Sequence, residues 1–259
     1  MRITSLGFRT DVALRALEGA EVTDRGDHLV VRTPDNPDFW WGNFLLLARV
    51  PGPGQGREWL ARFAAEFPAA RHVALGVDST EDAETPEEFA AAGLEADRAT
   101  VLTGARLRPP AHPSTQAEIR PLDGDGDWRQ SVDLAIRCFD GGEPGDFLER
   151  RAVARRRLTR AGAGAWFGAF ENGRLLAQLG LFDVGDGYAR YQHVETDPLA
   201  RRRGLAGTLV WTAARYGREV LGTGTFVIVA DPAGAAIRLY RACGFTARQS
   251  QLSFERPPG

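Results

Sequence analysis

The chain has no lysine, because all 32 of its basic residues are arginine. This absence excludes any mechanism that passes through a Schiff-base lysine. Cysteine is scarce, with only Cys138 and Cys243. Two cysteines are too few for a disulfide framework and are typical of a reducing compartment. We therefore expect a cytoplasmic protein.

Long apolar segments are also missing. No uncharged stretch approaches the ~18–20 residues that a membrane helix needs, and the first ten residues contain no apolar run of a signal peptide. The four histidines are scattered, so no metal site is expected. We predict no membrane partner.

Charge is distributed unevenly along the chain. Residues 1–112 carry 12 arginines against 17 acidic groups, a net charge of −5, whereas residues 113–259 carry 20 against 17, a net charge of +3. A basic half suits an anionic ligand such as a nucleotide cofactor, although ordinary variation between domains explains the difference equally well. The surplus of three is too small to indicate nucleic-acid binding.

A proline-rich segment divides the sequence. Residues 106–116 contain three prolines and no hydrophobic periodicity, which is typical of an extended linker. We predict a first domain over 1–108, a linker over 109–116 and a second domain over 117–259.

The second half alternates strand and helix patterns. Asn172-Gly173 between two apolar runs predicts a tight hairpin, since both central positions of a type I′ turn need positive φ. The helix expected at 147–160 carries Arg150, Arg151, Arg155, Arg156 and Arg157. We expect most of these side chains in solvent, with one or two available to cofactor phosphates. Strands are predicted at 117–122, 165–171, 175–182, 188–196 and 225–230. Helices are predicted at 128–139 and 147–160, with a third that begins near 203 and a fourth that ends at 241.

The first half repeats this layout in outline. Gly204 lies 40 residues before the pair Gly244-Phe245, and Gly54 lies 39 residues before Gly93-Leu94. This agreement predicts a duplicated domain, with two unrelated α/β domains as the alternative.

The turn between residues 196 and 208 is the clearest candidate for a binding site. A helix begins near Arg203, and a helix N-terminus presents unpaired N–H groups and a positive dipole end to anions. Gly204, Ala206 and Gly207 keep the turn small enough for a phosphate to reach the backbone. The alternative is a solvated basic helix start.

Two motifs together resemble the GNAT acetyltransferase superfamily. Arg201, Gly204 and Ala206 match its signature of Gln or Arg, two residues, Gly, one residue, and Gly or Ala. Leu239-Tyr240, followed after three residues by Gly244-Phe245, matches its next element. The resemblance covers about 115–255 well and 1–108 in outline. It implies an α/β (α+β mixed sheet) fold of two GNAT-like domains, each a mostly antiparallel sheet flanked by helices, with splayed central strands.

The resemblance also implies a cofactor and its contacts. In this family the pyrophosphate of acetyl-CoA sits on the amides of the turn, and the pantetheine arm pairs with the preceding strand, here Val194–Thr196. Tyr240 matches the tyrosine proposed to protonate the CoA thiolate, unless it simply packs its helix onto the sheet. The cofactor-binding residues predicted in this way are Val194, Glu195, Thr196, Arg201, Arg202, Arg203, Gly204, Leu205, Ala206, Gly207, Thr208, Asp231, Ala236 and Tyr240.

The strand 188–196 is unusually polar and supplies the candidates for a general base. Strict alternation would place Tyr191, His193 and Glu195 on one face. We consider His193 and Glu195 as the base, acting directly or through water, although each could instead hydrogen-bond within the fold. Some family members have a catalytic glutamate where this chain has Arg190, and many have an asparagine where it has Ala233.

The sequence thus predicts an N-acetyltransferase that transfers the acetyl group of acetyl-CoA to a primary amine by direct attack in a ternary complex. A non-catalytic acyl-CoA sensor or scaffold is the alternative, and a dinucleotide oxidoreductase is disfavoured because the turn lacks Gly-x-Gly-x-x-Gly. The acceptor would be a small molecule or a peptide, and the protein a monomer or homodimer. In the first half Pro51 and Pro53 replace residues that a phosphate turn needs, so we expect no cofactor there.

Overall fold

The chain forms two compact units. The computed structural model describes residues 1–80, 84–139 and 146–258. The first unit comprises Met1–Val101 with Arg248–Gly259, and the second comprises Leu102–Ala247. Each unit combines strands with helices, which confirms the predicted α/β class. Within the described ranges, no helix has both the length and the apolar character required to cross a membrane.

The first unit is a mixed sheet with helices on both faces. Its elements are α1 (Leu6–Glu18), β1 (Glu21–Asp24), β2 (His28–Arg32), η1 (Trp40–Gly42), β3 (Phe44–Leu47), α2 (Gly56–Glu66), β4 (Val73–Val77), α3 (Glu87–Ala91), β5 (Glu95–Gly104) and, from the end of the chain, β11 (Thr246–Arg256). The strand order is β1-β2-β3-β4-β11-β5. The pair β3–β4 is parallel, whereas β1–β2, β2–β3 and β4–β11 are antiparallel.

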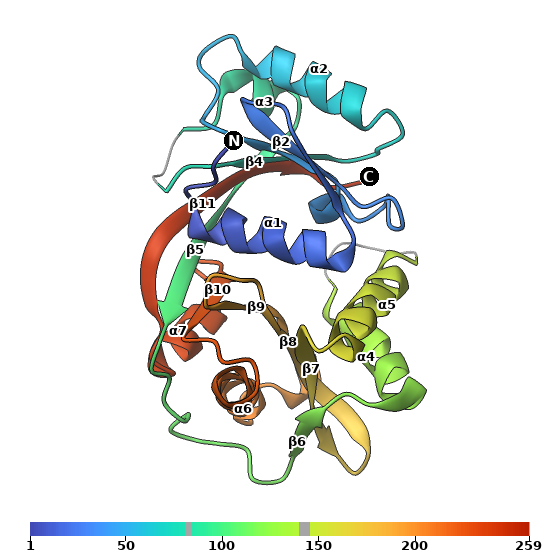
Figure 1. The fold of residues 1–259 in the computed structure, drawn as a ribbon, viewed down its shortest axis with the longest axis vertical. Coiled ribbons are helices and arrows are strands. Elements are labelled where there is room, and N and C mark those ends of the chain that lie inside the picture. The colour runs from blue at the N-terminus through green and yellow to red at the C-terminus, as the bar shows by residue number, and fades with distance from the viewer. Residues whose placement is uncertain (81–83, 140–145, 259) are drawn as a thin grey trace. The chain divides into compact units, whose positions relative to one another are not determined.

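The sequence of strand β3, Phe-Leu-Leu-Leu, is apolar at every position. Phe44 and Leu46 belong to the apolar cluster formed with α1, and Leu45 and Leu47 belong to the cluster formed with α2 and α3. All four side chains are fully buried. A strand covered on both faces has no polar side, so alternation disappears from its sequence. Figure 1 shows α1 and α2 on opposite faces of these strands.

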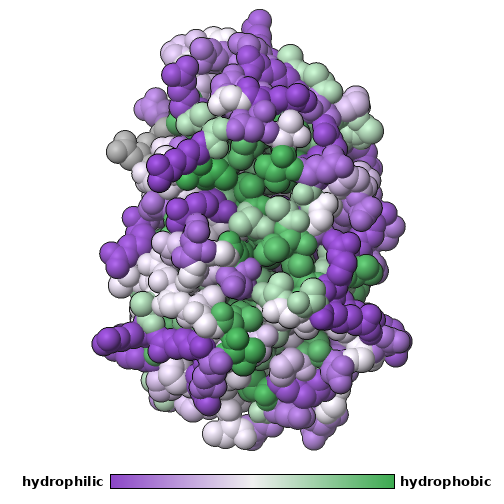
Figure 2. All heavy atoms as spheres, in the orientation of Figure 1, coloured by the Kyte–Doolittle hydropathy of each residue, from purple (hydrophilic) through white to green (hydrophobic). Residues whose placement is uncertain are grey.

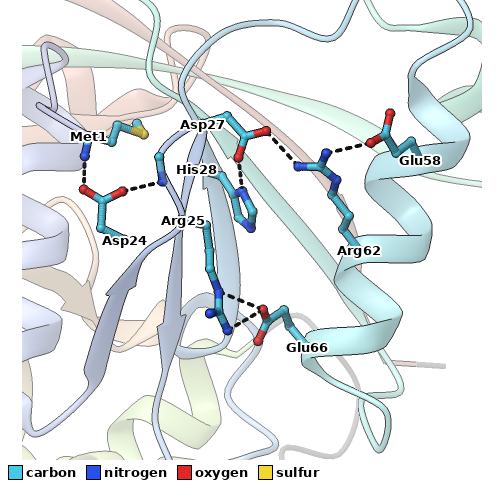
Figure 3. Close-up of polar contacts among 9 residues, drawn as sticks. Met1, Asp24, Arg25, Asp27, His28, Glu58, Arg62 and Glu66 are labelled. Atoms are coloured by element: carbon cyan, nitrogen blue, oxygen red, sulfur yellow. Dashed lines mark hydrogen bonds and ion pairs between the residues drawn. The ribbon is translucent and has the colours of Figure 1, made fainter.

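Ion pairs join the β1–β2 hairpin to α2 (Figure 3). Arg25 contacts Glu66 at 2.9 Å, and Arg62 contacts Asp27 at 2.8 Å. Asp27 also lies 2.6 Å from the ring of His28. Hydrophilic side chains predominate over the region of α2 in Figure 2. Such exposed pairs contribute little each, about 0–1 kcal/mol, so they add little to the stability of this unit.

Most of the last strand, β11, belongs to the first unit, although its first two residues belong to the second. Residues Leu252 to Arg256 of β11 pair antiparallel with β4, from Leu252↔Val77 to Arg256↔Val73. Leu252 and Phe254 are fully buried in the apolar cluster of α2 and α3. The predicted second domain, 117–259, therefore differs from the second unit at its C-terminal end, because residues 252–256 pair with β4 of the first unit.

The second unit is a mostly antiparallel sheet. Its further elements are β6 (Glu118–Pro121), α4 (Gly124–Cys138), α5 (Phe147–Arg160), β7 (Gly164–Glu171), β8 (Arg174–Asp183), β9 (Tyr188–Thr196), η2 (Pro198–Ala200), α6 (Leu205–Glu219), β10 (Thr225–Ala230) and α7 (Ala235–Ala242). The order is β10-β9-β8-β7-β6, with β10–β9 parallel and the other neighbours antiparallel. Helices α4 and α5 lie on the opposite face from α6 (Figure 1).

Several predicted elements of this unit are confirmed. Strands β9 and β10 have the predicted bounds. At the β7–β8 hairpin, Asn172 has φ 49° and Gly173 has φ 76°, the two positive values that a type I′ turn requires. Helix α4 begins four residues earlier than predicted, because Asp123 accepts a hydrogen bond from the Gly124 amide and caps it.

The predicted linker 109–116 packs against the second unit. The Arg108 amide donates to the carbonyl of Cys243 at 2.8 Å, and the Ser114 amide donates to the hydroxyl of Thr208 at 2.9 Å. Leu107 is buried in the core of this unit. The segment lacks helix and strand as its prolines predict, but these contacts make it part of the second unit.

Candidate functional site

Strand β9 contains a one-residue bulge at the polar positions. Gly180 pairs with Gln192 and Gln178 pairs with Glu195, so two residues of β9 oppose one residue of β8. His193 lies in the bulge with φ 45°, a left-handed conformation uncommon for a residue with a Cβ. The bulge interrupts the alternation of side chains along the strand.

The bulge makes the predicted shared face wrong. Tyr191 faces α6, where its hydroxyl donates to the Val210 carbonyl at 2.7 Å. His193 and Glu195 lie toward the α4 and α5 side, in contact with Arg151 and Gln178 respectively. His193 and Glu195 are thereby neighbours, and Tyr191 is a core residue on the opposite face.

The segment after β9 forms a tight turn before α6. The carboxylate of Asp197 accepts from the Leu199 amide at 3.0 Å and starts the short helix η2. Arg202 and Gly204 then both adopt positive φ, 63° and 76°. Gly204 is the N-cap of α6 and provides no capping side chain. The first amides of α6 are therefore available to an external acceptor.

Gly204 is required for two reasons. Its left-handed φ disfavours any residue with a Cβ. In addition, a Cβ there would lie 2.3 Å from the carbonyl oxygen of His112 and 3.0 Å from the Ser114 amide nitrogen. The predicted linker therefore packs directly against the turn at Gly204.

A pocket of about 480 Å³ lies in front of this turn. This volume is within the usual range of small-molecule sites, ~300–1,000 Å³. Of the predicted cofactor-binding residues, all but Thr208 and Asp231 line it. The lining residues are Cys138, Val194, Glu195, Thr196, Ala200, Arg201, Arg202, Arg203, Gly204, Leu205, Ala206, Gly207, Ala235, Ala236, Leu239 and Tyr240.

The two remaining residues have internal roles. The Thr208 hydroxyl donates to the Gly204 carbonyl and accepts from the Ser114 amide, both at 2.9 Å. Asp231 accepts from the Ala233 amide at 2.8 Å and stabilises the turn before α7. Both side chains shape the segments around the pocket without lining it.

The pocket lies where strands β9 and β10 separate. Their parallel pairing runs from Thr225↔Tyr188 to Val227↔Arg190, and no later pair is recorded between these two described strands. Residues 194–196 and helix α7 line the pocket beyond that point. The predicted splayed central strands are thus confirmed, and they leave a strand edge that a ligand can pair with.

Tyr240 combines packing with access to the pocket. The side chain is 4% exposed, and its ring contacts Phe245 edge-on with centroids 6.1 Å apart. Burial raises its pKa above the ordinary value of 10. The phenol therefore stays protonated at neutral pH, as a proton donor must.

Glu195 is held between strand β8 and helix α5. Gln178 Nε2 donates to its Oε2 at 2.7 Å, and His193 Nδ1 lies 3.5 Å from its Oε1. Burial raises the pKa of Glu195 above its ordinary value, while Arg155, Gln178 and Arg151 act in the lowering direction. The side chain retains 18% exposure and lines the pocket, whereas His193 does not line it.

Comparisons with known proteins agree with this geometry. The family model "Acetyltransferase (GNAT) family" matches residues 128–245. Residues 128–245, here called the GNAT domain, thus match this family over less than half of the chain. The match contains the turn, the strand edge and Tyr240. No curated protein gives a significant match.

Solved structures resemble the chain over nearly its whole length. A functionally unknown conserved protein from Staphylococcus epidermidis has TM-score 0.72 at 10% identity, covering 93% of this chain and 95% of that one. A GCN5-related N-acetyltransferase from Kribbella flavida has TM-score 0.62 at 15% identity, covering 98% of both. A tandem GNAT protein from the clavulanic acid biosynthesis pathway has TM-score 0.54 at 16% identity, covering 100% and 90%. At these identities the likeness concerns the fold.

Two buried arginines of the GNAT domain differ from the sequence prediction. Arg151 and Arg155 of α5 are 7% and 3% exposed. Arg151 Nη2 lies 2.6 Å from His193 Nε2, and the Arg155 guanidinium lies 4.3 Å from the centre of the Trp166 ring. Neither lines the pocket. The expectation that arginines of this helix are solvated or meet phosphates is wrong for both, because β7 and β9 supply their partners.

The arginines of the turn itself are oriented differently from one another. Arg201 and Arg202 are exposed at the pocket, whereas Arg203 is paired with the carboxylate of Glu171 at 2.6 Å. Sequence reasoning also missed Cys138, which lines the pocket near the Thr196 carbonyl. A single cysteine at the end of a helix carries no local signal of such a position.

The first unit has a pocket of similar volume with opposite charge. It is lined by Val50, Pro51, Pro53, Gly54, Glu84, Thr85, Pro86, Glu87 and Glu88. Among these described residues three are glutamates and none is basic. Carboxylates at this position would repel a diphosphate. The absence of cofactor binding in the first unit stays a prediction, now with an electrostatic reason.

Proposed function

We propose that the GNAT domain is an acetyl-CoA-dependent N-acetyltransferase acting on a primary amine. One observation carries this proposal: the unpaired strand edge at residues 194–196, the amino end of α6 and Tyr240 line a single pocket. These three features correspond to the needs of a thioester donor, namely a partner for the pantetheine amides, an anion site for the diphosphate and an acid for the thiolate.

The residues would act in a direct transfer. A backbone N–H of the β9 edge polarises the thioester carbonyl, and the neutral amine attacks the carbonyl carbon. Glu195 accepts the proton that the amine nitrogen loses, directly or through water. As the carbon–sulfur bond breaks, Tyr240 donates its proton to the departing sulfur. The products are an amide and free CoA.

Cys138 lies beside this pocket, yet its chemistry favours direct transfer. Burial raises the pKa of Cys138 to about 11, and the nearby Glu195 carboxylate adds to the effect. A thiol with this pKa is protonated at neutral pH and is a poor nucleophile. We therefore infer a ternary complex without an acyl-cysteine intermediate.

A non-catalytic acyl-CoA binder is the second candidate, and two residues favour it. Arg190 is buried where some family members have a catalytic glutamate, and Ala233 provides no side-chain amide to the pantetheine. Purified protein mixed with acetyl-CoA and a panel of small amines and peptide N-termini separates the two candidates. Release of free thiol with one amine supports the enzyme, whereas tight CoA binding without thiol release on any amine supports the binder.

Binding of CoA itself is tested at Ala206, because Gly204 cannot be changed without backbone strain. Ala206 is the second residue of α6 and lines the pocket. In the Ala206→Glu variant the carboxylate favours the helix dipole but repels a diphosphate. We expect CoA affinity in a calorimeter to fall at least about tenfold, or about 1.4 kcal/mol, with an unchanged or raised melting temperature.

The matched control is Ala206→Gln, which has nearly the same volume and no charge. It should lose less affinity than Ala206→Glu. If both variants bind CoA as the unmodified chain does, the diphosphate does not sit on this turn and the proposal fails.

A further inference from the structure

Gln178 is a fully buried amide whose four hydrogen bonds fix its orientation. Its Oε1 accepts from Trp166 Nε1 at 3.0 Å and from Ser131 Oγ at 2.5 Å. Its Nε2 donates to the Ser131 carbonyl at 3.0 Å and to Glu195 Oε2 at 2.7 Å. An indole N–H can only donate, so Trp166 must face the oxygen of the amide. Gln178 therefore directs N–H toward Glu195.

The contact with Arg151 determines which ring nitrogen of His193 carries the proton. A guanidinium can only donate, so His193 Nε2, which lies 2.6 Å from Arg151 Nη2, must be the acceptor. The imidazole is then neutral and carries its proton on Nδ1. This nitrogen lies 3.5 Å from Glu195 Oε1, a distance of electrostatic contact and not of a short hydrogen bond.

We propose that Gln178 and His193 are positioning residues that present N–H groups to both oxygens of the Glu195 carboxylate. Trp166 and Arg151 set the two orientations. The arrangement keeps Glu195 ionised and oriented at the pocket, ready to accept a proton from the amine. This inference rests on the proposed function only for the role of Glu195 as the base. The proton positions themselves follow from the contacts.

The charged groups around Glu195 come from three elements. Arg151 and Arg155 approach from α5, Cys138 from α4 and His193 from β9 itself. The arginines favour the ionised carboxylate, and the protonated thiol of Cys138 is neutral. Burial acts in the opposite direction and makes the carboxylate more basic. A base that is both basic and ionised suits proton transfer near neutral pH.

The tautomer of His193 is tested without any acceptor amine. The chain has only four histidines, so ¹⁵N-labelled imidazoles can be resolved by NMR and His193 assigned from the His193→Gln variant. We expect the neutral Nδ1–H form at pH 7. Arg151→Lys keeps a donor-only group and should preserve this form, whereas Arg151→Met should populate the Nε2–H form or imidazolium. An Nε2–H or charged His193 in the unmodified chain overturns the inference.

The pH dependence of the reaction tests the effect on Glu195. Gln178→Met removes a donor to the ionised carboxylate, which raises the pKa of the base. The acidic limb of the kcat/KM profile should then move up by about one pH unit. Trp166→Phe keeps Gln178 and the aromatic ring but removes one of the contacts that orient the amide, while the Ser131 carbonyl still accepts from Nε2. It should therefore give a smaller upward shift.

A purely structural role would lower the rate at all pH values and leave the acidic limb in place, which overturns the positioning role. The NMR measurement and the pH profile also distinguish failure of this inference from failure of the proposed function. If no amine is acetylated, the function fails while the NMR result still decides the proton arrangement.

Discussion

At the residue scale, Tyr240 belongs both to the core and to the pocket. Its ring packs against Phe245 with only 4% of the side chain exposed, while the residue also lines the pocket beside Ala236. Among the described residues, no hydrogen-bond partner is recorded for its hydroxyl. The ring thus has a packing role, and the hydroxyl is available for chemistry.

The Tyr240→Phe variant separates these two roles. It removes only the hydroxyl, so the free energy of unfolding should change by less than about 0.5 kcal/mol. If Tyr240 protonates the thiolate, kcat should fall roughly 10²-fold or more, while acetyl-CoA affinity stays within twofold. Thiol release under saturating substrate and calorimetry measure the two quantities. An unchanged kcat would assign the acid role to another group or to water.

At the element scale, two hydrogen bonds connect the proline-rich segment to the amino end of α6. The hydroxyl of Thr208 joins the two, since it accepts from the Ser114 amide and donates to the Gly204 carbonyl. The sequence match suggested that Thr208 contacts the cofactor. The structure gives it a supporting position behind the turn.

Replacing Thr208 with valine keeps the shape and removes both hydrogen bonds. Because the Ser114 amide loses its partner, we expect a loss of about 1–3 kcal/mol in the free energy of unfolding, together with weaker CoA binding. Thr208→Ser retains the hydroxyl and should preserve both properties more closely. If Thr208→Val weakens CoA binding with no loss of stability in urea denaturation, the hydroxyl contacts the cofactor directly.

Elements of the second unit could be predicted because their signals are local. Apolar runs and Asn172-Gly173 determine the β7–β8 hairpin, and the small residues of the turn mark the start of α6. The bulge at His193 could not be predicted, since it depends on register with β8 and not on alternation within β9. Buried Arg151 was missed for a similar reason. An arginine-rich helix looks solvated until a partner distant in sequence is brought to it.

At the scale of the whole molecule, compact units and sequence segments do not coincide. The last strand crosses from the second unit into the first, so two phenylalanines nine residues apart lie in different cores. Phe245 is 2% exposed and contacts Tyr191 and Tyr240, and Phe254 is 0% exposed and contacts Phe89. No local pattern in the sequence distinguishes these two positions.

This pair provides a matched test of the division into units. Phe254→Ala should cost about 3–5 kcal/mol, with hydrogen-exchange protection lost first in β4 and α3 of the first unit. Phe245→Ala should cost a similar amount, with protection lost first in β9 and α7 of the second unit. Loss of protection in β9 and α7 for both variants would assign the whole C-terminal segment to the second domain, as the sequence alone predicts. If each variant loses hydrogen-exchange protection in a different unit, the end of the chain belongs to the first unit through its pairing with β4. The reason is that the cavity left by each ring destabilises only the core that surrounds it.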